Sequence, residues 1–160
     1  MTYEGSIFRV KHLFCVSVWK CFLRYMRGIW RLSGKRYEES FQDFQWNLNN
    51  CENLGINNLV YKHLGIICAR QENYEEAENY LLKASSLKRV ERDGELFMWL
   101  GYVFMVKQKY PESLDCFRKA NKLGQRGLQK YFVQHEYVKD HINKLEDHIK
   151  ETYKEIITFN

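Results

Sequence analysis

The chain has 160 residues, enough for one compact domain, and its single proline and nine glycines suit a helical protein better than a turn-rich sheet protein. Ordinary apolar and charged contents exclude a disordered chain. The formal net charge of +5 is concentrated in residues 1–36, which carry +7. The rest of the chain is slightly acidic, so no nucleic-acid partner is expected.

The first predicted element is a basic, aromatic helix over residues 1–20, and no helix breaker interrupts the pattern before Gly28. Over residues 7–32, apolar residues recur every three or four positions and cations occupy much of the rest. Three interpretations stay open for this segment: it packs on the following helices, lies on a membrane surface, or contacts a partner protein. No uninterrupted run of 18 apolar residues occurs in the chain, so we expect no standard transmembrane helix, and no cleaved signal peptide.

The next elements belong to a repeated unit. The stretch NYEEAENYLLKASSLK at 73–88 reappears in outline as KYPESLDCFRKANKLG at 109–124. Generic amphipathic helices share apolar spacing, but they do not share a glycine, a tyrosine and small residues at fixed places. The matched positions, all 36 residues apart, are Gly65 and Gly101, Tyr74 and Tyr110, Ala77 and Ser113, Leu81 and Phe117, and Ala84 and Ala120.

The matched glycines predict a helix hairpin. A glycine in the middle of a helix costs about 1 kcal/mol relative to alanine. That cost is reasonable where a second helix approaches closely, and the small residues Ala77 and Ser113 suit the facing helix. The polar stretches RQEN and KQK lie between the two helices of each unit and are expected to form the turns.

This pattern resembles that of the tetratricopeptide repeat, W-x2-L-G-x2-Y followed by A, F, A and a final P. Units at 58–91 and 94–127 match, although neither has the final Pro, and a degenerate unit at 21–54 precedes them. The resemblance implies an all-α fold, a short right-handed α-solenoid of about three helix hairpins with a capping helix at each end.

The last predicted element is a helix over residues 128–157, whose apolar positions alternate in steps near three and four. It is expected to cap the last repeat, and the alternative that it forms a homodimer stays open. Its histidines, His135, His141 and His148, are six and seven residues apart. Because helical metal ligands need spacings of three or four, we expect a solvated face here and no metal site.

Motifs that carry enzymatic chemistry are missing. We find no glycine-rich phosphate loop, nucleophile elbow or paired-histidine motif, so we predict no enzyme, catalytic residue or cofactor. The five cysteines form no C-x-x-C pair, and we expect reduced core thiols. The predicted location is cytoplasmic, with membrane association left open.

The resemblance implies a concave surface, lined by the first helix of each unit, that binds a peptide or helix of another protein. Some members hold a partner's C-terminal carboxylate with a Lys and an Asn one turn apart, but Ile66 replaces the Asn beside Lys62, so EEVD-type tails are not expected. Carried over by position, the groove residues are Tyr25, Ile29, Lys62, Ile66, Arg70, Met98, Tyr102 and Met105.

The leading hypothesis is a non-enzymatic interaction module, an adaptor or chaperone. Its size and architecture are similar to those of the small repeat-type chaperones of bacterial type III secretion. The alternative is a peripheral membrane adaptor, anchored through residues 7–32, whose repeats recruit a partner.

Overall fold

A computed structural model describes the backbone of residues 4–51, 55–87, 93–124 and 134–158. Within these ranges the side chains are described from residue 18 to residue 152, except that of residue 135. The described chain forms seven α-helices and no strand. The helices are α1 Glu4–Ser33, α2 Tyr37–Asn50, α3 Asn57–Arg70, α4 Tyr74–Ser86, α5 Gly94–Val106, α6 Tyr110–Gly124 and α7 His135–Thr158.

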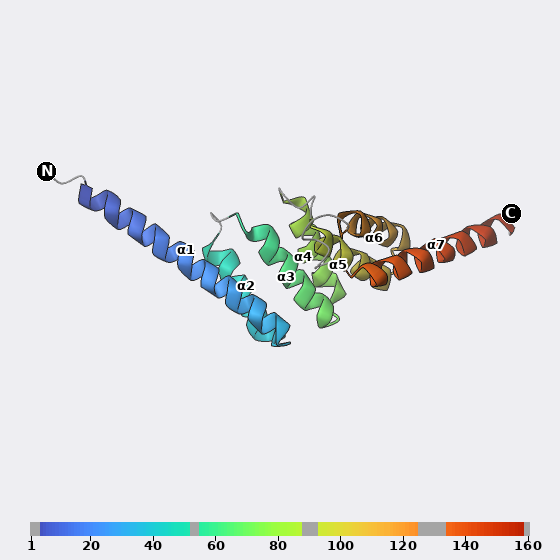
Figure 1. The fold of residues 1–160 in the computed structure, drawn as a ribbon. Coiled ribbons are helices and arrows are strands. Elements are labelled where there is room, and N and C mark those ends of the chain that lie inside the picture. The colour runs from blue at the N-terminus through green and yellow to red at the C-terminus, as the bar shows by residue number, and fades with distance from the viewer. Residues whose placement is uncertain (1–3, 52–54, 88–92, 125–133, 159–160) are drawn as a thin grey trace.

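The helices form a row of stacked hairpins (Figure 1). Helix α1 packs on α2, α3 on α4 and α5 on α6, while α7 packs on α6 at the end of the row. The predicted all-α solenoid of helix hairpins is therefore confirmed. Helix α1 runs through residue 20 without a break, and the outer ends of α1 and α7 project from opposite ends of the molecule. No described helix is long and apolar enough to cross a membrane.

The turns inside the three hairpins share one backbone geometry. A residue other than glycine adopts a left-handed conformation in each, at Lys35, Glu72 and Gln108. The next amide then donates a hydrogen bond of 2.9 Å to the carbonyl five residues earlier, as when the Asn73 amide reaches the Cys68 carbonyl. This bond satisfies a carbonyl that the helix end would otherwise leave without a partner. The backbone repeats here although the turn sequences differ.

The close helix approach that the glycines predict is confirmed. A Cβ atom built on Gly65 would lie 2.6 Å from Cγ of Leu81, and one built on Gly101 would lie 3.0 Å from the Phe117 ring. The hydroxyl of Ser113 donates a hydrogen bond of 2.7 Å to the Gly101 carbonyl. Small residues therefore let the backbones of α5 and α6 approach, and the large side chains fill the space around them.

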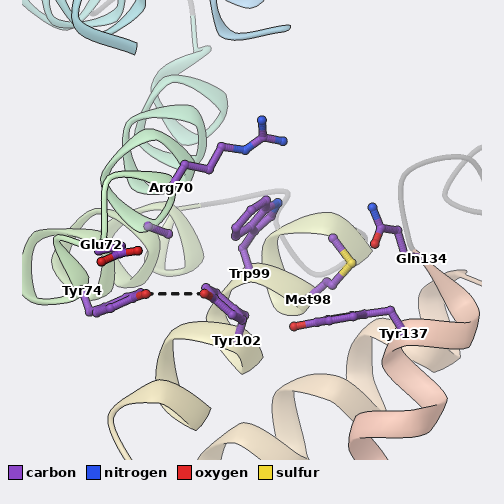
Figure 2. A pocket seen from close by; sticks show the side chains of 9 residues that line it. Arg70, Glu72, Tyr74, Met98, Trp99, Tyr102, Gln134 and Tyr137 are labelled. Carbon is purple, nitrogen blue, oxygen red and sulfur yellow. Dashed lines mark hydrogen bonds between the residues drawn. The ribbon is translucent and has the colours of Figure 1, made fainter. Parts of the chain in front are cut away.

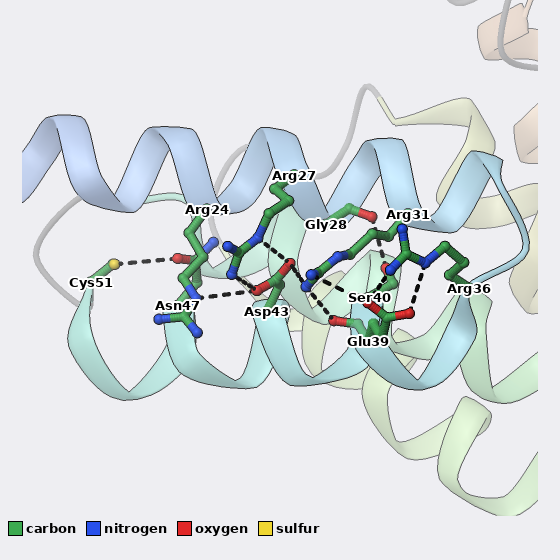
Figure 3. A network of polar contacts seen from close by, with 10 residues as sticks. All are labelled: Arg24, Arg27, Gly28, Arg31, Arg36, Glu39, Ser40, Asp43, Asn47 and Cys51. Carbon is green, nitrogen blue, oxygen red and sulfur yellow. Dashed lines mark hydrogen bonds and ion pairs between the residues drawn. The ribbon is translucent and has the colours of Figure 1, made fainter.

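The α1–α2 hairpin contains a buried ionic cluster that the α3–α4 and α5–α6 hairpins lack among the described residues (Figure 3). The Asp43 carboxylate on α2 is almost fully buried and accepts hydrogen bonds from three arginines of α1. Its distances are 3.1 Å to Arg24 Nε, 2.9 Å to Arg27 Nε and 2.6 Å to Arg31 Nη1. The α1–α2 hairpin therefore adds a buried carboxylate to the apolar packing of Phe44 against Gly28.

The expectation of reduced thiols is wrong for one pair of cysteines. Cys21 on α1 and Cys51, at the end of α2, form a disulfide with their Cα atoms 6.2 Å apart. Cys68 and Cys116 are free and buried, as expected, and the Cys15 side chain lies outside the described residues. The pairing was not predictable from spacing, because the two residues are separated by 30 positions and share no motif.

Helix α7 covers the last hairpin. Its Val138 and Leu145 are buried in one cluster with Phe117 of α6, and Ile142 and Ile149 pack against the same cluster. The described part of α7 therefore occupies the position of a capping helix.

Candidate functional site

The face formed by α1, α3 and the start of α5 contains a hollow of about 540 Å³. Its lining combines apolar side chains with the charged groups of Lys62, Arg70, Asp93 and Glu95. Tyr25 and His63 meet in its wall, with the Tyr25 hydroxyl 3.0 Å from His63 Nε2. The lining residues are Tyr25, Met26, Ile29, Leu32, Ser33, Leu59, Lys62, His63, Ile66, Arg70, Asp93 and Glu95.

A second hollow of about 330 Å³ adjoins it and is aromatic. Figure 2 shows Trp99 and Tyr102 of α5 facing Tyr137 of α7 across it. The Tyr74 and Tyr102 hydroxyls are 3.5 Å apart and close one side. The lining residues are Ala69, Arg70, Glu72, Tyr74, Met98, Trp99, Tyr102, Gln134 and Tyr137.

Arg70, the last residue of α3, lines both hollows. Its guanidinium carbon lies 5.5 Å from the centre of the Trp99 ring, in a cation–π contact. No carboxylate among the described residues forms an ion pair with it. Arg70 is exposed, so its charge is available to a bound molecule.

Lys62, unlike Arg70, has its charge paired within the protein. It is buried, and its Nζ lies 2.9 Å from both the Asp93 and the Glu95 carboxylates. Burial alone would lower the pKa of Lys62, but the charges of Glu95 and Asp93 raise it above its ordinary value. Asp93 also caps α5 by accepting a hydrogen bond from the Leu96 amide. Lys62 therefore ties α3 to the start of α5 and offers no free charge to a ligand.

Two further titratable groups of the larger hollow, Tyr25 and His63, stay neutral near pH 7. Burial, with help from the Lys62 charge, lowers the pKa of His63 to about 3. Burial also raises the pKa of Tyr25 to about 12. Tyr25 and His63 consequently add no charge to the hollow across the physiological range. Within the described residues, no group of three or more potential ligands is placed to hold a metal ion.

The structure brings together most of the predicted groove residues. Seven of the eight line one of the two hollows, and Arg70 lines both. Met105 lines neither and packs instead against the cluster around Met98. The prediction missed the part of the aromatic hollow that comes from outside the first helices, since Tyr137 belongs to the expected cap. The sequence marked Tyr137 only weakly as a groove residue, because it lies at the border of the apolar face of α7.

The arrangement of hairpins is shared with known structures. The tetratricopeptide-repeat (TPR) domain of Arabidopsis OM64 superposes on this chain with a TM-score of 0.66 at 15% identity. The match covers 82% of this chain and 98% of that domain. The chain has the tetratricopeptide-repeat fold. The first such domain of Spaghetti (RPAP3), bound to the HSP90 peptide SRMEEVD, also gives 0.66, at 13% identity, covering 82% of this chain and 94% of that one.

A chain of the CopN–Scc3 complex gives a TM-score of 0.62 at 18% identity, covering 81% of this chain and 73% of that chain. No family model and no curated protein matches the sequence. At such identities the likeness establishes the tetratricopeptide-repeat fold and leaves the ligand to be argued from the site.

Proposed function

We propose that this tetratricopeptide-repeat protein is a non-enzymatic interaction module, an adaptor or chaperone, that binds a segment of another protein along the two adjoining hollows. The proposal rests on Arg70, which lines both hollows. The two hollows therefore form one elongated site with apolar, aromatic and cationic parts. Spaghetti (RPAP3) and yeast Sti1 domains of the same fold were solved with HSP90 or HSP70 ligands. A peptide or helix of a partner protein is therefore the expected class of ligand.

The chemistry of the groove narrows that class. Trp99, Tyr102 and Tyr137 favour an apolar or aromatic side chain in the smaller hollow. A carboxylate on the same segment would pair with Arg70. Lys62 cannot take this role, because Asp93 and Glu95 already satisfy it and would repel an incoming acid. An acidic EEVD-type tail is thus a poor ligand, and an apolar segment with one acid is a good one.

The test compares three baits in a pull-down from source lysate, read by quantitative mass spectrometry. The groove variant is Arg70→Glu with Tyr102→Ala, and the control is Lys122→Glu, an exposed charge reversal on α6. Lys62→Glu is unsuitable as a groove variant, because it would place a third carboxylate beside two others and unfold the site.

We expect a protein whose capture falls at least tenfold in the groove variant and is unchanged in the control. Peptides from that protein should then bind the purified wild type more tightly than SRMEEVD does. A partner retained equally by all three baits would contradict the proposal and move the interface off the groove. So would saturable binding of SRMEEVD that is lost on Arg70→Glu, since it would show a carboxylate site of the EEVD type.

A further inference from the structure

Helix α1 carries an apolar stripe on the side that faces away from the repeats. Its centre is Trp19, Leu23, Met26 and Trp30, whose spacing of four, three and four residues places them on one face of a helix. The opposite face holds Cys21, Gly28 and Leu32, which are buried against the rest of the chain. The stripe's exposed fractions are 60% for Trp19, 51% for Leu23, 46% for Met26 and 65% for Trp30.

Cations border this stripe along one edge. Lys20, Arg24 and Arg27 line a surface hollow of about 280 Å³ together with Leu23 of the stripe. Residues 18–36 contain six Lys and Arg residues and no acid. The Asp43 carboxylate of α2 neutralises only one of the three arginines it binds. The hollow therefore keeps an excess of positive charge next to a large apolar surface.

We propose that α1 docks on an anionic lipid membrane surface. The stripe would enter the boundary between headgroups and acyl chains, where Trp side chains are favoured. The hollow of Lys20, Arg24 and Arg27 would receive a lipid phosphate, with both positive charge and N–H donors available. The helix lies on the surface in this arrangement and does not cross it.

Two other occupants fit the charge pattern less well. A second copy docked through the same stripe would bring the cations of both copies together, because no acid lies in residues 18–36. Nucleic acid would suit the cations, and its bases stack on aromatic rings, but Leu23 and Met26 lie between Trp19 and Trp30 and present aliphatic surface. An anionic bilayer matches both the charge and the aliphatic centre.

Membrane docking leaves most of the groove accessible. Tyr25 and Ile29, which line the larger hollow, lie on a different side of α1 from Leu23 and Trp30, and Met26 is the residue that the stripe and the hollow share. The protein could therefore hold a partner segment while α1 rests on lipid. The inference stands on α1 alone and survives if the proposed groove ligand is wrong.

The test is co-sedimentation of the full chain with phosphatidylcholine vesicles, with and without phosphatidylserine, at low and high salt. We expect wild type to bind only the vesicles with phosphatidylserine, with a blue shift of tryptophan emission, and to dissociate as salt rises. Leu23→Glu with Met26→Glu should abolish binding, and Leu82→Glu, at another exposed leucine on α4, should leave it unchanged. Lys20→Glu, an exposed substitution that leaves the Asp43 cluster intact, should weaken binding at least fivefold.

Several outcomes would overturn the proposal. One is no binding to the anionic vesicles at low salt, and another is equal binding to both kinds of vesicle. A dimer in light scattering that the double variant converts to a folded monomer would assign the stripe to a second copy. Retention of RNA that is lost on Lys20→Glu but kept by the double variant would assign the cations to nucleic acid.

Discussion

At the scale of single residues, the packing of α1 on α2 depends on the buried carboxylate of Asp43. Replacing it by asparagine leaves Arg24, Arg27 and Arg31 without their shared counter-ion. Because these guanidinium groups are partly exposed, we expect a loss near the lower end for broken buried pairs, about 3 kcal/mol. Urea denaturation of Asp43→Asn measures it. The matched control is Glu38→Gln, which neutralises an exposed carboxylate on the same helix.

The pH dependence of stability gives a second readout of the same carboxylate. Burial alone would raise the pKa of Asp43, but hydrogen bonds from Arg27 and Arg24 and the nearby guanidinium charges hold it below its ordinary value. A folded pKa below the unfolded one adds stability that is present above the unfolded value and lost as pH falls through the folded value. Wild type should therefore lose stability in the acid range more steeply than Asp43→Asn. Parallel curves would contradict this.

At the scale of elements, the spacing between α3 and α4 depends on Gly65. Alanine would favour the helix by about 1 kcal/mol, but its Cβ would lie 2.6 Å from Leu81 Cγ and 3.2 Å from the Leu81 backbone nitrogen. The backbone cannot yield as a side chain can, so we expect Gly65→Ala to lower the free energy of unfolding by a net ~1–2 kcal/mol. Gly34→Ala is the control, because its Cβ would be 3.6 Å from the nearest atoms. Equal stabilities of the two variants would show that the helices are free to separate.

The stability of the α5–α6 hairpin depends on the helix α7 that covers it. Leu145 is buried against the Phe117 cluster, so Leu145→Glu places an unpaired charge in the core and should cost more than about 3 kcal/mol. Asn143→Glu, on the exposed side of the same helix, should cost little. Light scattering should show the same molecular mass for both variants and wild type. A wild-type dimer that Leu145→Glu splits into folded monomers would instead assign α7 to dimerisation.

The elements themselves were predictable because the repeat records close packing in the sequence. Gly65 and Gly101 marked the contact points of two hairpins, and the structure places Leu81 and Phe117 against them. The ion pairing of Lys62 was harder to predict, since it depends on Asp93, which lies 31 residues away in the sequence. The apolar pattern of α1 was visible too, but periodicity does not tell which of two apolar sides of a helix finds a partner.

At the scale of the whole molecule, the Cys21–Cys51 disulfide ties down the helix that carries both the groove wall and the apolar stripe. The bond spans 30 residues, and closing a loop of that length restricts the unfolded chain by roughly 3–4 kcal/mol. We expect a reductant to lower the melting temperature by about 10 °C. Because a terminal hairpin contacts only one neighbour, α1 and α2 should separate from the row first. Hydrogen exchange would show this as early loss of protection in α2.

Matched cysteine variants decide whether the Cys21–Cys51 disulfide causes the change in melting temperature. Cys21→Ser should melt as reduced wild type does and should show no further response to reductant, because its partner thiol has nothing to pair with. Cys116→Ser removes a free buried thiol and should keep the full response to reductant. If oxidised and reduced wild type melt together, the two sulfurs are not bonded in solution, and the expectation of reduced thiols would be restored. If they differ, the protein is suited to an oxidising compartment, which is where such bonds persist.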